Sequence, residues 1–322
     1  MQVAEETARS APQALFTTLV NPTDVLARAI ALRTGLTAAG ICVEVPQLRR
    51  WLALQLGGYA RDVQVEYLGV NHVGWVSGWT YRGEDGNPLL RAALPTLMQQ
   101  AEWNPMNDWF AELFLATGDL RTSPYHCWPY AHSDTTRAQE RSHAYKAFNA
   151  ARIPAPFPFP WQDDLLAQAL AEDRMVPEYE DAPLQHIRMP YQYSDTRHTL
   201  GALALGLAGV ATGPVPLQVR NGDSNPLLPA DAWIEVPTCY EGGHLQPQNV
   251  GPISDWATAQ LRQIVAQRMA LSDWFVQGDP VDVSRAFLFW PDEVSMVGSE
   301  MADTGAFGNL MQASDGLPAE WY

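Results

Sequence analysis

The chain has 322 residues, of which 47% are hydrophobic and 17% charged, so its composition is that of a globular protein with a sizeable core. The formal net charge of -16 at pH 7 argues against binding to nucleic acid or to an anionic membrane, but a local arginine could still hold a small anionic substrate. Three cysteines are too few for a disulfide framework and the N-terminus is polar and acidic, so we expect a cytoplasmic protein without a signal peptide.

Strands and helices alternate in the first seventy residues. Apolar and β-branched runs predict strands at 14–20, 38–45 and 63–70, and amphipathic stretches between them predict helices at 22–35 and 47–57. This alternation is typical of an α/β fold with a parallel sheet.

The remainder of the chain has a different pattern. In chain order it predicts helical pieces at 89–118 interrupted by Pro95 and Pro105, an extended proline-rich stretch at 154–164, a buried helix at 199–211, a strand–turn–strand unit at 216–237 and an amphipathic helix at 256–275. The apolar run at 199–211 is too short to span a bilayer.

Two residues with metal-binding side chains each follow a predicted strand. Cys42 stands in GICVEVP and His72 in GVNHVGW. If the two strands are parallel neighbours, their carboxyl ends meet at one edge of the sheet, where α/β proteins keep their sites. A thiolate and an imidazole there could hold a divalent transition metal with open positions for sugar oxygens. The alternatives are that Cys42 is an inert small hydrophobe and His72 a solvated turn residue.

The order of several motifs resembles a known family. The resemblance lies in the order of six segments: NP, GICVEVP, GVNHVGW, SPYHCWPY, RMPYQYS and NGDSNPLLPADAWIEVP. The chain resembles glycoside hydrolase family 4, and most of all its 6-phospho-β-glucosidase branch. The resemblance implies an α/β fold in which residues 1–66 are the C-terminal remnant of a Rossmann-like parallel sheet. Residues 67–322 would then be a substrate and dimerisation domain of the α+β type found in lactate and malate dehydrogenases.

The same resemblance implies a redox-neutral glycosidase that uses NAD and a divalent metal, with Mn²⁺ expected. In this family C3 of the sugar is oxidised, C2 is deprotonated, the aglycone leaves from C1, and water and hydride are then added back, a recorded exception to the two-carboxylate scheme. The implied partner is a small sugar substrate, with or without a 6-phosphate, and the implied assembly is a homo-oligomer or a pairing with a missing N-terminal segment.

The family's functional residues fall on six positions of this sequence. The resemblance places metal ligands at Cys42 and His72, the C2 base at Tyr125, substrate contacts at Asn21 and Asn71, and an arginine for the sugar phosphate at Arg188. Tyr130 is a rival for the base. Each side chain also has a structural alternative, such as aromatic packing for Tyr125 and an ion pair for Arg188.

Three departures from the family pattern bear on activity. No glycine-rich dinucleotide fingerprint follows a strand, so we expect a chain that begins within the nucleotide-binding domain and that is poorly soluble alone or needs a partner. Val43 stands where relatives have a polar residue, and Met189–Pro190 replaces two glycines. A non-catalytic remnant that keeps the metal, and half of a 2-hydroxy acid dehydrogenase, are therefore kept as alternatives.

Overall fold

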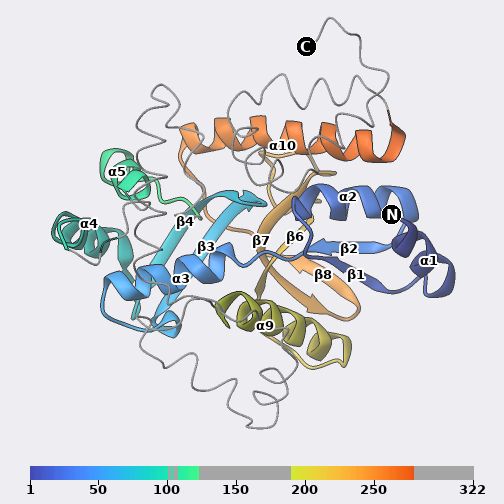
Figure 1. The fold of residues 1–322 in the computed structure, drawn as a ribbon, viewed down its shortest axis with the longest axis horizontal. Coiled ribbons are helices and arrows are strands. Elements are labelled where there is room, and N and C mark those ends of the chain that lie inside the picture. The colour runs from blue at the N-terminus through green and yellow to red at the C-terminus, as the bar shows by residue number, and fades with distance from the viewer. Residues whose placement is uncertain (101–102, 104–107, 123–189, 279–322) are drawn as a thin grey trace, which may run out of the picture.

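The computed structural model describes residues 1–100, 103, 108–122 and 190–278 (Figure 1). The helices are α1 (Gln2–Ser10), α2 (Thr23–Thr34), α3 (Glu44–Gln55), the 3₁₀ turn η1 (Ala60–Asp62), α4 (Gly86–Leu97), α5 (Asp108–Thr117), α9 (Pro190–Leu207) and α10 (Asp255–Gln277). The strands are β1 (Leu15–Thr18), β2 (Thr37–Gly40), β3 (Val63–Val70), β4 (Val73–Tyr81), β5 (Glu84–Asp85), β6 (Val215–Arg220), β7 (Trp233–Glu241) and β8 (His244–Pro247). Within the described parts of the chain, no helix combines the length and the apolar character needed to cross a membrane.

All the described strands form one sheet in the order β1-β2-β6-β7-β3-β4-β5, and β8 pairs with β7. The strand and helix elements expected in the first seventy residues are present, and the fold class is α/β. The expectation of three parallel neighbouring strands is wrong, because only β1 and β2 run parallel and β6 and β7 lie between β2 and β3. Most side chains of β6 and β7 are buried, so these two strands require central places in the sheet.

The central core lies between this sheet and the helices beside it. In Figure 1, α10 runs along one side of the strands and α9 along the other. The predicted amphipathic helix is confirmed as α10, whose Leu261, Ile264 and Val265 are buried against the sheet. The prediction of a buried helix at 199–211 is wrong in part. Helix α9 ends at Leu207, and it packs on the sheet with only one face, through residues such as Leu203.

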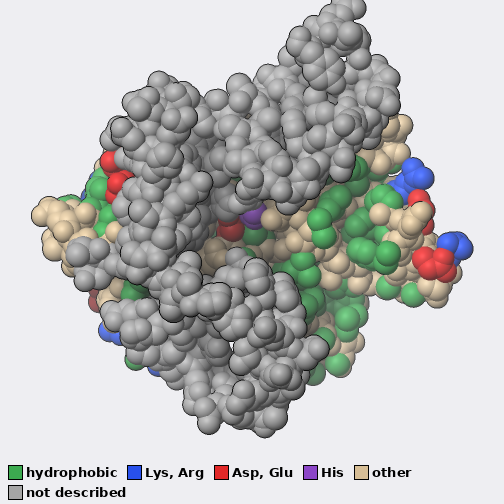
Figure 2. All heavy atoms as spheres, viewed as in Figure 1, with side chains coloured by type: hydrophobic (Ala, Val, Ile, Leu, Met, Phe, Trp, Pro, Cys, Tyr) green, Lys and Arg blue, Asp and Glu red, His purple; other side chains and the backbone are tan. Residues whose placement is uncertain are grey.

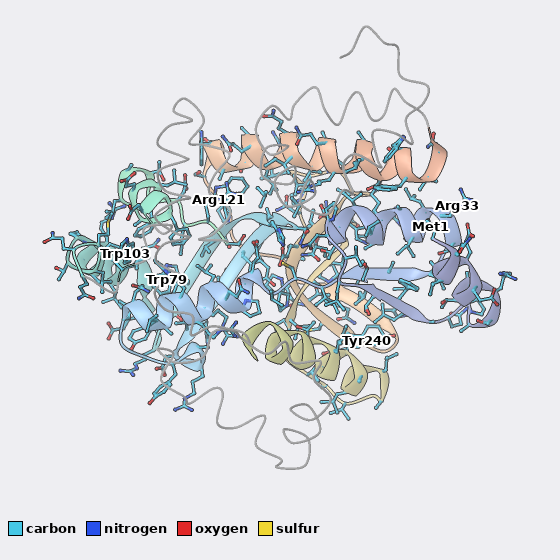
Figure 3. The ribbon with its side chains drawn as sticks, in the orientation of Figure 1. Met1, Arg33, Trp79, Trp103, Arg121 and Tyr240 are labelled. Carbon is cyan, nitrogen blue, oxygen red and sulfur yellow. The ribbon has the colours of Figure 1, made fainter. Side chains whose placement is uncertain are left out.

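A second core joins α3, α4 and α5 to β3 and β4, around Trp79 and close to Trp103 (Figure 3). The predicted interruption at Pro95 is wrong, since Pro95 lies inside α4. The missing backbone hydrogen bond is tolerated because the neighbouring Leu90 and Leu94 are fully buried in this core. Pro105 and the stretch 154–164 lie outside the described residues.

Strand β1 is an edge strand of the sheet. It pairs with β2 on one side, and no described strand pairs with its other side. Figure 2 shows hydrophobic side chains gathered over this part of the molecule, around α2, β1, β2 and β8. Leu19, Val20 and Leu32 are among the exposed large apolar residues. An open parallel edge beside apolar surface is the arrangement that a further strand or a partner would cover.

Candidate metal centre

One row of paired residues crosses four strands of the sheet. Gly40 of β2 pairs with Gln218 of β6, Gln218 pairs with Glu235 of β7, and Glu235 pairs with Gly69 of β3. Strands β2 and β6 are joined by this one pair alone, and so are β3 and β7. The row therefore brings the segment after β2 and the turn after β3 to the same region, although these strands are not neighbours.

Three side chains with metal-binding atoms meet in that region. The sulfur of Cys42, a carboxylate oxygen of Glu44 and an imidazole nitrogen of His72 all lie within 4.8 Å of one another. Cys42 is 5% exposed and Glu44 3%, whereas His72 is half-buried, so the cluster reaches the surface through the imidazole. Sulfur, nitrogen and oxygen donors in this combination suit a divalent transition metal.

His72 owes its position to a tight turn. Val70 and Val73 are the last pair of β3 and β4, so Asn71 and His72 form a two-residue hairpin connection. The backbone of His72 has a φ of 67°, in the left-handed region that the second central residue of a type II turn adopts and that non-glycine residues rarely occupy. A side chain held on strained backbone is directed by the turn, and such strain is concentrated at functional sites.

Glu44 is positioned by the start of helix α3. The strand expected to continue to residue 45 ends at Gly40, and α3 begins at Glu44. Pro46 is tolerated in a first helical turn, and Glu44 lies at the positive end of the helix dipole. The buried Leu48 and Leu52 then keep α3 against the second core, which fixes where the carboxylate points.

A layer of buried polar side chains lies next to the three donors. The hydroxyl of Thr23 donates to Gln218 Oε1 at 2.7 Å, and the backbone amide of Thr23 donates to Asn71 Oδ1 at 3.2 Å. These bonds tie the start of α2 to β6 and to the β3–β4 turn. Asn71 is 1% exposed, and its Nδ2 atom has no hydrogen-bond partner among the described residues. A buried amide donor of this kind is suited to a ligand oxygen.

Acidic side chains are concentrated around the cluster. Burial, followed by the charges of Glu44 and Asp24, raises the pKa of Glu235 to about 8, although Gln218 opposes the shift. Burial, Glu235 and Glu44 raise the pKa of the Cys42 thiol well above its ordinary value. Both shifts reflect carboxylates that crowd one another in a dry interior, an environment that a bound cation stabilises.

The other residues expected at the site are placed unequally. Asn71 is next to His72 and belongs to the polar layer. Asn21 is exposed, forms a cis peptide bond with Pro22, and lies two residues before Thr23. Tyr125 and its rival Tyr130 lie outside the described residues.

Arg188 also falls outside the described residues.

Glu44 and Glu235 were missed by sequence reasoning. The signal for Glu44 is its spacing, two residues beyond Cys42 where a helix begins, but assigning residues 38–45 to a strand hid it. Glu235 looked like one more residue of an apolar strand, and its burial beside the cluster depends on the pairing of β7 with β3.

Comparison with known proteins identifies the family. The sequence profile of the family 4 glycosyl hydrolase C-terminal domain matches residues 67–291. The chain belongs to glycoside hydrolase family 4. A sequence search among curated proteins finds no match.

Solved structures show that this family 4 chain shares the fold of several glucosidases. A 6-phospho-α-glucosidase from gut microorganisms, solved with NAD and Mn²⁺, has 15% identity and a TM-score of 0.63 over 98% of this chain and 70% of its own. A 6-phospho-β-glucosidase from Thermotoga maritima, solved with manganese, NAD⁺ and glucose 6-phosphate, has 16% identity and a TM-score of 0.58 over 89% of this chain and 63% of its own. LplD from Bacillus subtilis has 19% identity and a TM-score of 0.62 over 94% and 71%.

Proposed function

We propose that this family 4 chain forms the metal- and sugar-binding side of a NAD- and metal-dependent glycosidase that acts on 6-phosphoglycosides. The observation that carries the proposal is the convergence of Cys42 and His72 on one buried, electronegative region. Similar structures solved with Mn²⁺, NAD and glucose 6-phosphate support the choice of ligands. We assign residues 1–66 to a nucleotide-binding domain and residues 67–322 to the substrate domain, as family membership suggests.

Each assigned side chain has a limited task. When bound, NAD supplies hydride transfer at C3 of the sugar and a divalent ion supplies stabilisation of negative charge on the adjacent oxygens. Cys42, which is buried, and His72, which is half-buried, would hold the ion. The unsatisfied Nδ2 of Asn71 is a donor for a sugar oxygen, and Asn21 contributes from the start of α2.

The base and the phosphate contact complete the assignment. Tyr125 removes the proton from C2, and because a free tyrosine has a pKa near ~10 it needs a neighbouring positive charge to act. Arg188 pairs with the 6-phosphate through its planar guanidinium. Both roles rest on the family motifs of the sequence.

The test is release of nitrophenol from α- and β-nitrophenyl 6-phosphoglucosides by the full chain with NAD⁺ and Mn²⁺. We expect release that chelation abolishes and that Cys42→Ser lowers by more than the ~10–100-fold seen when only a residue that orients a ligand is removed. Cys239→Ser is the matched control, since Cys239 is a half-buried free cysteine on β7 outside the cluster. Wild-type rates in Cys42→Ser would falsify the metal assignment.

A non-catalytic family member is the second candidate, favoured by one observation. Val43, directly after Cys42, places an apolar side chain where relatives have a polar one. Such a protein binds the metal, measured by calorimetry, without any turnover of either anomer. Metal binding without product release identifies this candidate, and absence of both rejects the two functions together.

A further inference from the structure

We propose that Glu44 is a third protein ligand of the ion, and that the resulting sulfur–nitrogen–oxygen site holds Zn²⁺ or Co²⁺ more tightly than Mn²⁺. The inference rests on the proposed function, because it takes Cys42 and His72 as the first two ligands. It concerns the metal that this chain prefers and the number of positions left for the substrate.

The distances bring Glu44 within reach of a shared ion. Bonds of ~2.0–2.3 Å from a tetrahedral ion place two donor atoms roughly 3.5 Å apart. The donors of Cys42, Glu44 and His72 are all within 4.8 Å of one another without an ion. Closing that gap takes about 1 Å of movement of the donor atoms.

The backbone holds the carboxylate in place from both sides. Glu44 is two residues from Cys42 and is the first residue of α3, so the sulfur and the carboxylate are fixed by the same short segment. At 3% exposure, Glu44 is shielded from bulk water. In such a position a carboxylate binds a cation without competition from solvent.

The surrounding charges independently favour a cation of charge two. Glu235 and Asp24 are also buried, and the charges of Glu44 and Asp24 both act on Glu235. Arg268 lies 3.8 Å from Asp24, which places one positive charge on the α10 side of the group. The carboxylate of Glu44 and the sulfur of Cys42 lie together. A divalent ion that displaces the thiol proton to solvent would neutralise the carboxylate and the resulting thiolate at once.

The donor set determines the metal. Manganese prefers carboxylate, carbonyl and water oxygens in octahedral geometry, whereas thiolate and imidazole favour zinc and cobalt. Three protein ligands and one open position are also typical of catalytic zinc sites. With Glu44 bound, the ion has one position fewer for sugar oxygens than a site built from Cys42 and His72 alone.

Metal affinity and the Co²⁺ spectrum test this assignment on the full chain. After chelator stripping, Zn²⁺, Co²⁺ and Mn²⁺ are titrated in competition with a chromogenic chelator. We expect Zn²⁺ to bind at least about 100-fold more tightly than Mn²⁺, and Co²⁺ to give a thiolate charge-transfer band with intense visible bands of a four- or five-coordinate ion.

Glu44→Gln, nearly equal in size, should lower Zn²⁺ affinity by more than the ~10–100-fold seen when a residue only orients a ligand. It should also shift the visible Co²⁺ bands while the thiolate band stays. Glu235→Gln is the matched control, because it removes a buried carboxylate from the same region but outside the donor trio. It should leave the Co²⁺ bands unchanged. Thermal unfolding of both metal-free variants verifies folding, and Glu44→Asp, which keeps a carboxylate, should retain part of the affinity.

Three results separate the two proposals. If Glu44→Gln keeps wild-type affinity and an unchanged Co²⁺ spectrum while Cys42→Ser loses the thiolate band, Glu44 is not a ligand and the proposed function stands. Mn²⁺ binding as tight as Zn²⁺ overturns the selectivity. If neither Cys42→Ser nor His72→Ala weakens any metal, the metal centre itself is rejected.

Discussion

The backbone amide of Thr23 donates a hydrogen bond to the side-chain oxygen of Asn71, 3.2 Å away and 48 residues later in the sequence. This bond satisfies an amide at the N-terminus of α2, an end that lacks a side-chain cap of its own. It also fixes the turn that carries His72. The side-chain oxygen of Asn71 thus supports both the start of α2 and the turn at His72, and the first prediction tests both roles.

Replacing Asn71 by alanine removes the acceptor and leaves the amide of Thr23 buried without a partner. We expect a loss of about 1–3 kcal/mol in the free energy of unfolding, measured by urea denaturation. Because the turn also directs His72, metal affinity measured by calorimetry should fall in the same variant. Unchanged stability combined with unchanged metal affinity would show that this bond is dispensable.

The raised pKa of Glu235 makes the stability of the metal-free protein depend on pH. The folded state keeps a proton up to about pH 8, whereas the unfolded chain releases it above about pH 4.5. The folded state therefore binds more protons between these values, so this contribution is complete at low pH and is lost as pH rises toward 8. Glu235→Gln cannot ionise. It should match the wild type near pH 5 and exceed it by roughly 1–4 kcal/mol near pH 8.

Denaturation curves at several pH values in the presence of a chelator measure that difference. The informative quantity is the stability of Glu235→Gln minus that of the wild type at each pH, because other titrating groups cancel. A difference that stays flat from pH 5 to pH 8 is the result that contradicts the assignment.

Metal affinity should increase with pH, since the raised pKa of Cys42 means that binding displaces a proton from the thiol. Below that pKa the affinity should rise about tenfold per pH unit from this group alone. Cys42→Ser should bind the metal weakly at every pH. Its affinity should also increase less steeply with pH, because no thiol proton is displaced. Cys239→Ser should keep the wild-type slope, and calorimetry in buffers of different ionisation enthalpy counts the protons released.

Gly40 has no space for a side chain where it joins β2 to β6. A Cβ atom there would lie 2.5 Å from Gln218 Oε1 and 2.8 Å from Thr23 Cβ. We expect Gly40→Ala to cost roughly 1–3 kcal/mol, the range for overpacking, and to weaken metal binding because the polar layer is displaced. Gly201→Ala is the control. It sits in α9 with open space around its Cα, and a helical alanine there should be neutral or stabilising by up to about 1 kcal/mol.

The local patterns of the sequence predicted most elements and two of the three clustered donors. The apolar residues were sufficient to predict α10, which buries one face, and β3, which alternates in its first half and is buried throughout its second half. Cys42 and His72 were proposed as a pair, and the structure brings them together. The reason given for their meeting, two parallel neighbouring strands, was wrong.

What the sequence could not supply was the pairing between distant segments. Strands β6 and β7 enter between β2 and β3 from more than a hundred residues away, and no local pattern encodes that insertion. The burial of Glu235 follows from it, as does the polar layer around Gln218. Glu44 was hidden by a smaller error, the extension of β2 by five residues into the start of α3.

Since β2 meets β6 at one residue pair and β3 meets β7 at one residue pair, the sheet consists of three ribbons joined to one another by single residue pairs. Cys42 belongs to the first ribbon and His72 to the third, with the β6–β7 ribbon between them. Under the proposed function, an ion bound by both residues would link the outer ribbons across the middle one. Removing that ion should then lower the stability of the sheet as well as any activity.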